Sequence, residues 1–161
     1  QIERYRLALD VGDNAIPITA RKVTNGEPAS IDFAGKITLI EFWATWCGPC
    51  QEPMQKLNLL AANNASRWHD RVQLFAVSID DSSEVAKRHL EARGWLSTEN
   101  LIDEPGQNAG VVKSGFDAKS ARDYTIQGVP TAILIDPAGK VVFRGHPSEL
   151  DLQAKIEELL K

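Results

Sequence analysis

Apolar and polar positions follow three different patterns along the first part of the chain. Residues 16–23 alternate loosely, and Asn25-Gly26 separates them from a second apolar stretch at residues 29–33, which predicts a β-hairpin. Residues 37–44 (ITLIEFWA) form an almost continuous apolar run, typical of a strand buried on both faces. Residues 51–67 then place apolar side chains at helical spacing, so a helix is predicted to follow the buried strand closely.

Strand and helix patterns continue to alternate in the rest of the chain. Residues 72–79 predict a second buried strand. A helix is predicted to follow it, with Ser82 or Ser83 as its N-cap and Gly94 at its end. Alternating strands and helices predict an α/β fold with parallel strand pairs in the middle and a hairpin at each end. The remaining predicted elements are a short strand at 100–103, a loop at 104–115, a short helix at 118–126, a hairpin of strands 129–136 and 141–144, and a last helix at 149–160 capped by Ser148.

Length and composition fit one soluble globular domain. The chain has 161 residues, of which 43% are hydrophobic and 25% charged, and a chain of this size needs no disulfide staples to hold a core. Residues 1–14 show no clear pattern and are interpreted as an N-terminal extension of unknown role, while residues 15–161 form the domain. The first residue is Gln rather than Met, which indicates a processed or trimmed product from which a leader or membrane anchor could have been removed.

Charge and hydropathy exclude two classes of partner. The net charge is −4, so a protein that binds the phosphate backbone of nucleic acids is not expected. No apolar run approaches the roughly 20 residues that a membrane helix needs. We therefore expect no membrane contact through this segment. We also expect the protein to be a monomer.

The two cysteines, Cys47 and Cys50, carry the clearest chemistry in the sequence. They lie where the buried strand gives way to a helix, and Pro49 suits the first helical turn. The free N–H groups and dipole of a helix N-terminus stabilise a thiolate, which is the species that attacks a disulfide. This predicts that Cys47 is an exposed nucleophile of low pKa and that Cys50, less exposed, resolves the mixed disulfide.

Other uses of the cysteine pair are less well supported. A zinc site needs four ligands, and there is no second cysteine pair to complete one. Copper(I) binding lacks a suitably placed partner, because the only methionine, Met54, is interpreted as helix core. A peroxide reductase is a further alternative, but Thr45 stands too close to Cys47, only two residues before it, to match the threonine of that class of enzyme. A redox-inactive binding module is another alternative, but a pure scaffold has no use for two reactive thiols. The three histidines, which are scattered along the chain, are His69, His89 and His146.

Glu41 is an acidic residue inside the apolar strand. Its neighbours on both sides are apolar, so burial is expected to raise the pKa of its carboxyl group. Such a group can exchange a proton near neutral pH, and it could activate the thiol of Cys50 as a general base. The alternative is that Glu41 reaches an edge of the sheet or pairs with a lysine.

A resemblance to the thioredoxin superfamily rests on two segments. Residues 42–50 (FWATWCGPC) are highly specific for it, and residues 128–131 (GVPT) match its cis-proline loop. The resemblance covers residues 15–161. The hairpin ending in residues 31–36 (IDFAGK), and the extra material between the second buried strand and Pro130, are similar to the TlpA/ResA-like branch of thiol–disulfide oxidoreductases.

The resemblance implies roles for individual residues. Cys47 and Cys50 match the nucleophile and the resolving thiol, Glu41 matches a buried acidic position, and Pro130 matches the cis-proline, although spacing alone leaves an ordinary trans proline equally open. Protein disulfides are the implied substrates, an upstream thiol protein is the implied reductant, the location is extracytoplasmic, and no cofactor is needed beyond the Cys47–Cys50 disulfide. The residues expected to contact substrate are Trp46, Gly48, Pro49, Val129 and Pro130.

Two further features bear on the direction of electron flow and on Glu52. The Gly48-Pro49 dipeptide resembles the reducing members of the superfamily, near about −270 mV, although an oxidant or isomerase remains the alternative. Related sequences carry a helix-kinking proline five residues after the second cysteine, whereas Pro53 stands three after it. That change is expected to shift the kink toward the cysteines and puts a role for Glu52 in doubt.

Overall fold

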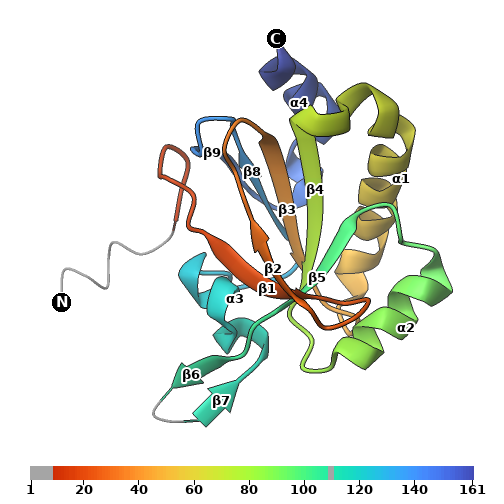
Figure 1. The fold of residues 1–161 in the computed structure, drawn as a ribbon, viewed down its shortest axis with the longest axis vertical. Helices are drawn as coiled ribbons and strands as arrows, with labels where there is room; N and C mark the ends of the chain where they lie inside the picture. The colour runs from red at the N-terminus through yellow and green to blue at the C-terminus, as the bar shows by residue number, and fades with distance from the viewer. Residues whose placement is uncertain (1–8, 109–110) are drawn as a thin grey trace.

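A sheet of seven strands forms the centre of the computed structural model, which describes residues 9–108 and 111–161 (Figure 1). β4 pairs in parallel with β3 and β5, and every other pairing in the sheet is antiparallel. A hairpin closes each edge of this mixed sheet, as the alternation of patterns predicts. The strand order is β2 (Pro28–Ile31), β1 (Ile18–Lys22), β5 (Glu99–Asp103), β4 (Val72–Ser78), β3 (Ile37–Trp43), β8 (Thr131–Ile135) and β9 (Val141–Gly145).

Helices cover both faces of β3, all of whose residues are buried. On one face Trp43 lies 5.8 Å from His89 and 6.2 Å from Trp95, measured between ring centroids. That face carries α1 (Gln51–Trp68) and α2 (Ser83–Arg93). On the other face Phe42 lies 6.0 Å from Tyr124, which directly follows the short helix α3 (Lys119–Asp123). The continuous apolar run therefore reflects burial on both sides.

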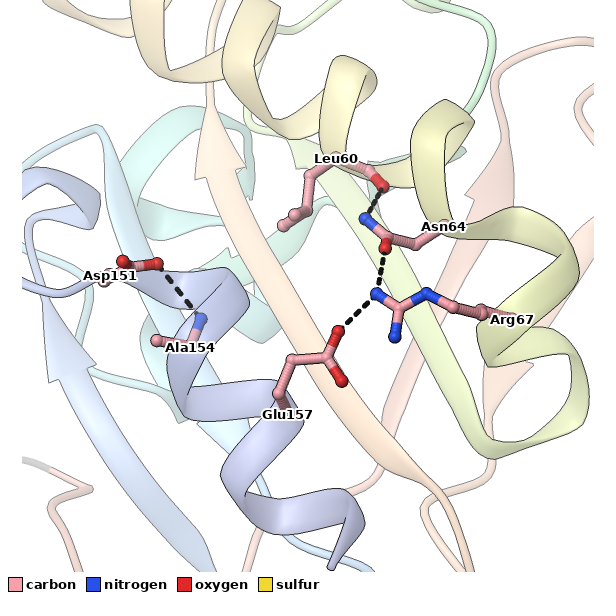
Figure 2. Close-up of polar contacts among 6 residues, drawn as sticks. All are labelled: Leu60, Asn64, Arg67, Asp151, Ala154 and Glu157. Atoms are coloured by element: carbon pink, nitrogen blue, oxygen red, sulfur yellow. Dashed lines mark hydrogen bonds and ion pairs between the residues drawn. The ribbon is translucent and has the colours of Figure 1, made fainter.

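The last helix, α4 (Leu152–Leu160), lies against α1, as Figure 2 shows. Arg67 on α1 joins Asn64 to Glu157 on α4. Asp151, and not Ser148 as predicted, caps α4 by accepting a hydrogen bond of 3.0 Å from the backbone N–H of Ala154. The prediction is wrong because Ser148 belongs to a preceding 3-10 helix, Pro147–Glu149, so α4 begins three residues later than predicted.

The region predicted as a loop at 104–115 contains a small hairpin. Its strands are β6 (Gly106–Asn108) and β7 (Val111–Lys113), and a 3-10 helix at Gly115–Asp117 follows. Strands of three residues are too short to show a period in the sequence. The helix predicted at 118–126 is likewise shorter, whereas the predicted cap at Ser82 and the end at Gly94 are both confirmed.

The described part of the N-terminal region runs beside β9. The backbone N–H groups of Gly12 and Ala15 each donate a hydrogen bond of 2.8 Å, to the carbonyl groups of Val141 and Gly139. Residues 1–8 of the predicted extension lie outside the described residues. No helix in the described part of the chain combines the length and apolar character needed to cross a membrane.

Candidate active site

Cys47 and Cys50 form a disulfide where the chain passes from β3 into α1. Cys47 caps a 3-10 helix, Gly48–Cys50, that leads directly into α1, and the two Cα atoms lie 5.3 Å apart. The strand-to-helix junction predicted from the sequence is therefore confirmed. It places Cys47 at a helical N-terminus, where unpaired N–H groups favour a thiolate.

Both cysteines are buried, although Cys47 is the more accessible of the two. Cys47 is 4% exposed and Cys50 is 0% exposed, so the predicted order holds but Cys47 is far less exposed than predicted. The Val129 segment accounts for this, because the Cys47 Sγ lies 3.5 Å from the carbonyl oxygen of Val129.

The Val129–Pro130 peptide bond is cis, as the family resemblance implies. Pro130 is buried just before β8, and Val129 is partly exposed. The backbone carbonyl group of Val129 lies beside Cys47. Segments separated by about 80 residues in the sequence therefore meet at the disulfide.

Glu41 lies fully buried in the middle of β3 and is 0% exposed. Its neighbours on the adjoining strands are Ala76 and Ala132, which offer it neither a charge nor a side-chain hydrogen bond. Neither carboxylate oxygen has a hydrogen-bond partner among the described residues. Burial without a partner disfavours the charged form and raises the pKa of Glu41 to about 8. Glu41 is two residues before Trp43, so its side chain lies on the α1 face of β3.

Glu52 and Pro53 lie in the first turn of α1 and do not disturb it. α1 runs without interruption from Gln51 to Trp68, because a proline in the first turn removes an N–H that needs no helical partner. The shift of a kink toward the cysteines stays a prediction, because a continuous helix can still bend. Glu52 is exposed and pairs with Lys56 at 3.2 Å, away from the buried sulfur of Cys50.

Asp80 is a buried acidic residue beside the site that the sequence analysis did not identify. Its carboxylate accepts hydrogen bonds from the backbone N–H of Thr45, at 3.1 and 3.2 Å, and from the Thr45 hydroxyl at 2.7 Å. The Ser78 hydroxyl also donates to it, at 2.5 Å. Asp80 therefore fixes the turn between β3 and Cys47. Its position after the carboxyl end of a buried parallel strand is a signal that could have indicated it.

A chain of side-chain contacts also reaches Cys47 from α2. The Gln51 amide donates a hydrogen bond of 2.8 Å to the carbonyl oxygen of Cys47, and its oxygen lies 2.8 Å from the Nε2 of His89. The His89 ring is flanked by Trp43 and Trp95. Burial lowers the pKa of His89, which favours a neutral ring that donates one N–H to Gln51. This arrangement holds the carbonyl group of Cys47 in one orientation.

Replacing Gln51 with methionine tests this contact. Methionine keeps the length of the side chain and removes both hydrogen bonds, so the oxidised protein is expected to lose about 1–2 kcal/mol of unfolding free energy. Urea unfolding at neutral pH measures the loss. A change within about 0.5 kcal/mol, as for an unengaged surface side chain, would contradict the role given to Gln51.

Two hollows adjoin the disulfide. One has a volume of about 550 Å³ and lies between the first turns of α1 and α4, with Gly48 and Pro49 in its wall. The other, of about 530 Å³, includes Val129 and Pro130. His146 lines both, so the two hollows meet at this residue. Four of the five predicted substrate contacts therefore line adjoining hollows, and the fifth, Trp46, is exposed next to Cys47.

The described residues contain no cluster of three or more His, Cys, Asp or Glu side chains that could hold a metal ion. Met54 is fully buried in α1, which confirms its interpretation as a core residue.

Comparisons with known proteins agree with this arrangement. The model of the AhpC/TSA family matches residues 11–144. The thiol:disulfide interchange protein HelX of Rhodobacter capsulatus is 30% identical over 128 residues, covering 78% of this chain and 62% of HelX. The thiol-disulfide oxidoreductase ResA of Bacillus thuringiensis is 26% identical over 130 residues, covering 80% of this chain and 66% of ResA. The chain thus spans slightly less than two thirds of the length of these two relatives.

A solved structure shows the same fold. The thioredoxin domain of a thiol-disulfide oxidoreductase from Bacteroides vulgatus superposes with a TM-score of 0.73 at 27% identity. The superposition covers 96% of this chain and all of that domain. The thioredoxin-like fold implied by the resemblance is therefore confirmed.

Proposed function

The chain belongs to the AhpC/TSA family, and from that premise we propose that it is a thiol–disulfide oxidoreductase that reduces disulfides in other proteins. The observation that carries the proposal is the Cys47–Cys50 disulfide, set at a helical N-terminus beside the Val129 carbonyl group. Names of similar proteins, among them a ResA and HelX, support the same reaction.

Catalysis proceeds in two exchange steps from the reduced protein. The Cys47 thiolate attacks a substrate disulfide, forms a mixed disulfide and releases one substrate thiolate, which takes up a proton. The Cys50 thiol then gives its proton to Glu41 and attacks the Cys47 sulfur, and the second substrate thiolate leaves and is protonated. The substrate gains two electrons and two protons, and the Cys47–Cys50 disulfide forms.

The substrate segment binds along the rim of the two hollows. Gly48 and Pro49 are exposed on one side of Cys47, and Val129 and Pro130 lie on the other. An extended peptide can pair with the Val129 backbone as an added strand does, while Trp46 covers its side chains. Recognition through backbone groups suits a protein that acts on several oxidised proteins.

The remaining features of the proposal follow from the family resemblance. Another thiol protein returns electrons to the Cys47–Cys50 disulfide, and the reaction takes place outside the cytoplasm, where disulfides persist. Residues 15–161 act as one monomeric domain with no cofactor beyond the disulfide.

Reduction of insulin tests the proposal. The reduced protein, freed of small thiols and mixed with insulin, is expected to release two insulin thiols for each Cys47–Cys50 disulfide formed. Thiol titration and mass spectrometry measure both quantities. Transfer no faster than with glutathione at the same thiol concentration would contradict the proposed function.

Peroxide reduction is the main competing activity, and the position of Thr45 argues against it. The Thr45 hydroxyl donates to Asp80 at 2.7 Å and is therefore engaged away from the cysteine sulfur. The reduced protein is expected to consume hydrogen peroxide no faster than a free thiol.

A further inference from the structure

We propose that Phe116 selects substrates in which an apolar side chain adjoins the reacting cysteine. The proposal rests on the proposed function and adds to it a residue from outside the cysteine and cis-proline segments. Phe116 lies in the 3-10 helix Gly115–Asp117, after the β6–β7 hairpin. Its ring lies edge-on to that of Trp46, with the centroids 6.3 Å apart and an angle of 66° between the planes.

Both rings of this pair are open to solvent. Trp46 is 62% exposed and Phe116 is 40% exposed. Large apolar side chains that lie together at the surface commonly mark a contact site. Aromatic side chains also lose little conformational freedom on binding, and the contact between the two rings holds them in place before a substrate arrives.

Backbone packing fixes the position of Phe116. The Asp103 carboxylate, at the end of β5, accepts hydrogen bonds of 2.9 and 2.8 Å from the backbone N–H groups of Ser120 and Ala121. A Cβ atom at Gly106 would collide with the backbone carbonyl oxygen of Asp117. The base of the hairpin therefore packs directly on the 3-10 helix that carries Phe116. The backbone that carries the Phe116 ring is held by these contacts. The ring can therefore keep its position when a substrate side chain packs against it.

The place of the ring pair identifies what it contacts. Trp46 directly precedes Cys47, and consecutive Cα atoms lie only about 3.8 Å apart. A substrate side chain on Trp46 and Phe116 must therefore come from a residue close to the cysteine that reacts with Cys47. Two uncharged aromatic rings favour an apolar side chain there, such as leucine, over a small polar one.

Two synthetic peptides test this inference. Each contains one intramolecular disulfide, and they differ only in a leucine or a serine next to one cysteine. Second-order rate constants are measured with the reduced protein, and glutathione disulfide serves as a substrate without a neighbouring side chain. The wild-type protein is expected to favour the leucine peptide about tenfold, a ratio typical of one apolar contact.

The Phe116→Ala variant should lose most of this preference. Its leucine-to-serine ratio is expected to fall to about twofold, while its rates with the serine peptide and glutathione disulfide stay within about twofold of wild type. Leu59→Ala is the matched control, because Leu59 is 51% exposed on α1 and lines neither hollow at the disulfide. That variant should keep the full preference.

The outcomes separate this inference from the proposed function. Reduction of all three substrates without a preference for leucine overturns the role of Phe116 alone. The same holds if Phe116→Ala keeps the preference shown by Leu59→Ala. Failure of the wild-type protein to reduce any of the three overturns the proposed function and this inference with it.

Discussion

Replacing Cys50 with alanine is expected to stop turnover and to leave substrate covalently bound to Cys47. The first exchange step needs only the Cys47 thiolate, whereas release needs the second thiol. Turnover should fall by more than about a thousandfold, as when one member of a catalytic unit is lost. Mass spectrometry after mixing with insulin should show one insulin chain attached to the protein, and dithiothreitol should release it.

Cys47→Ala is the matched control for this trapping experiment. Cys50 is 0% exposed, so it should not capture substrate when Cys47 is absent. A Cys50→Ala protein without an adduct, or a Cys47→Ala protein with an equal amount of it, would contradict the assigned order of attack.

Replacing Glu41 with glutamine is expected to change how stability depends on pH. The pKa of Glu41 is raised from 4.5 to about 8 by burial. Between these values the unfolded chain ionises Glu41 while the folded protein keeps it protonated. The contribution of Glu41 to the free energy of unfolding is therefore fully present below about pH 4.5. It is lost as the pH rises toward 8. Each pKa unit is equivalent to about 1.4 kcal/mol, so the loss amounts to several kcal/mol.

Urea unfolding of the oxidised protein across this pH range measures the effect. The unfolding free energy of wild type should decline with pH relative to that of Glu41→Gln, whose side chain does not titrate. Parallel curves for the two proteins would show that Glu41 is not protonated in the folded state at neutral pH.

The same substitution should slow the second exchange step more than the first. Glu41 accepts the Cys50 proton only when it is ionised, so release of substrate from the mixed disulfide should accelerate as the pH rises through about 8. Glu41→Gln should slow this step by about a hundredfold, the usual contribution of a general base, and leave the attack by Cys47 unchanged. Rapid-quench kinetics separate the two steps. Equal slowing of both would remove Glu41 from this role.

The parts of the site that were predicted correctly depend on short, continuous stretches of sequence. The apolar run at residues 37–44 predicts the buried strand, and Glu41 within it predicts a carboxyl group of raised pKa. Cys47 and Cys50 follow at the start of a helix, where their spacing allows a disulfide. Each of these inferences needs only neighbours in the chain.

The parts that were missed depend on contacts between distant segments. Asp80 holds Thr45 across 35 positions, and His89 reaches Gln51 across 38. No local pattern indicates such pairs, because the first joins the segments that follow the neighbouring strands β3 and β4 and the second joins α1 to α2. Phe116 was missed for a related reason. The short hairpin before it shows no periodic pattern, and its contact with Trp46 forms only when the chain folds.

The equilibrium redox potential of the Cys47–Cys50 pair tests the central claim most directly. Titration of the protein in glutathione or dithiothreitol buffers, followed by thiol quantification, gives this value. A reductant of protein disulfides should have a potential below about −230 mV. A potential at or above about −180 mV, the range of disulfide isomerases and oxidants, would contradict the proposed direction of electron flow.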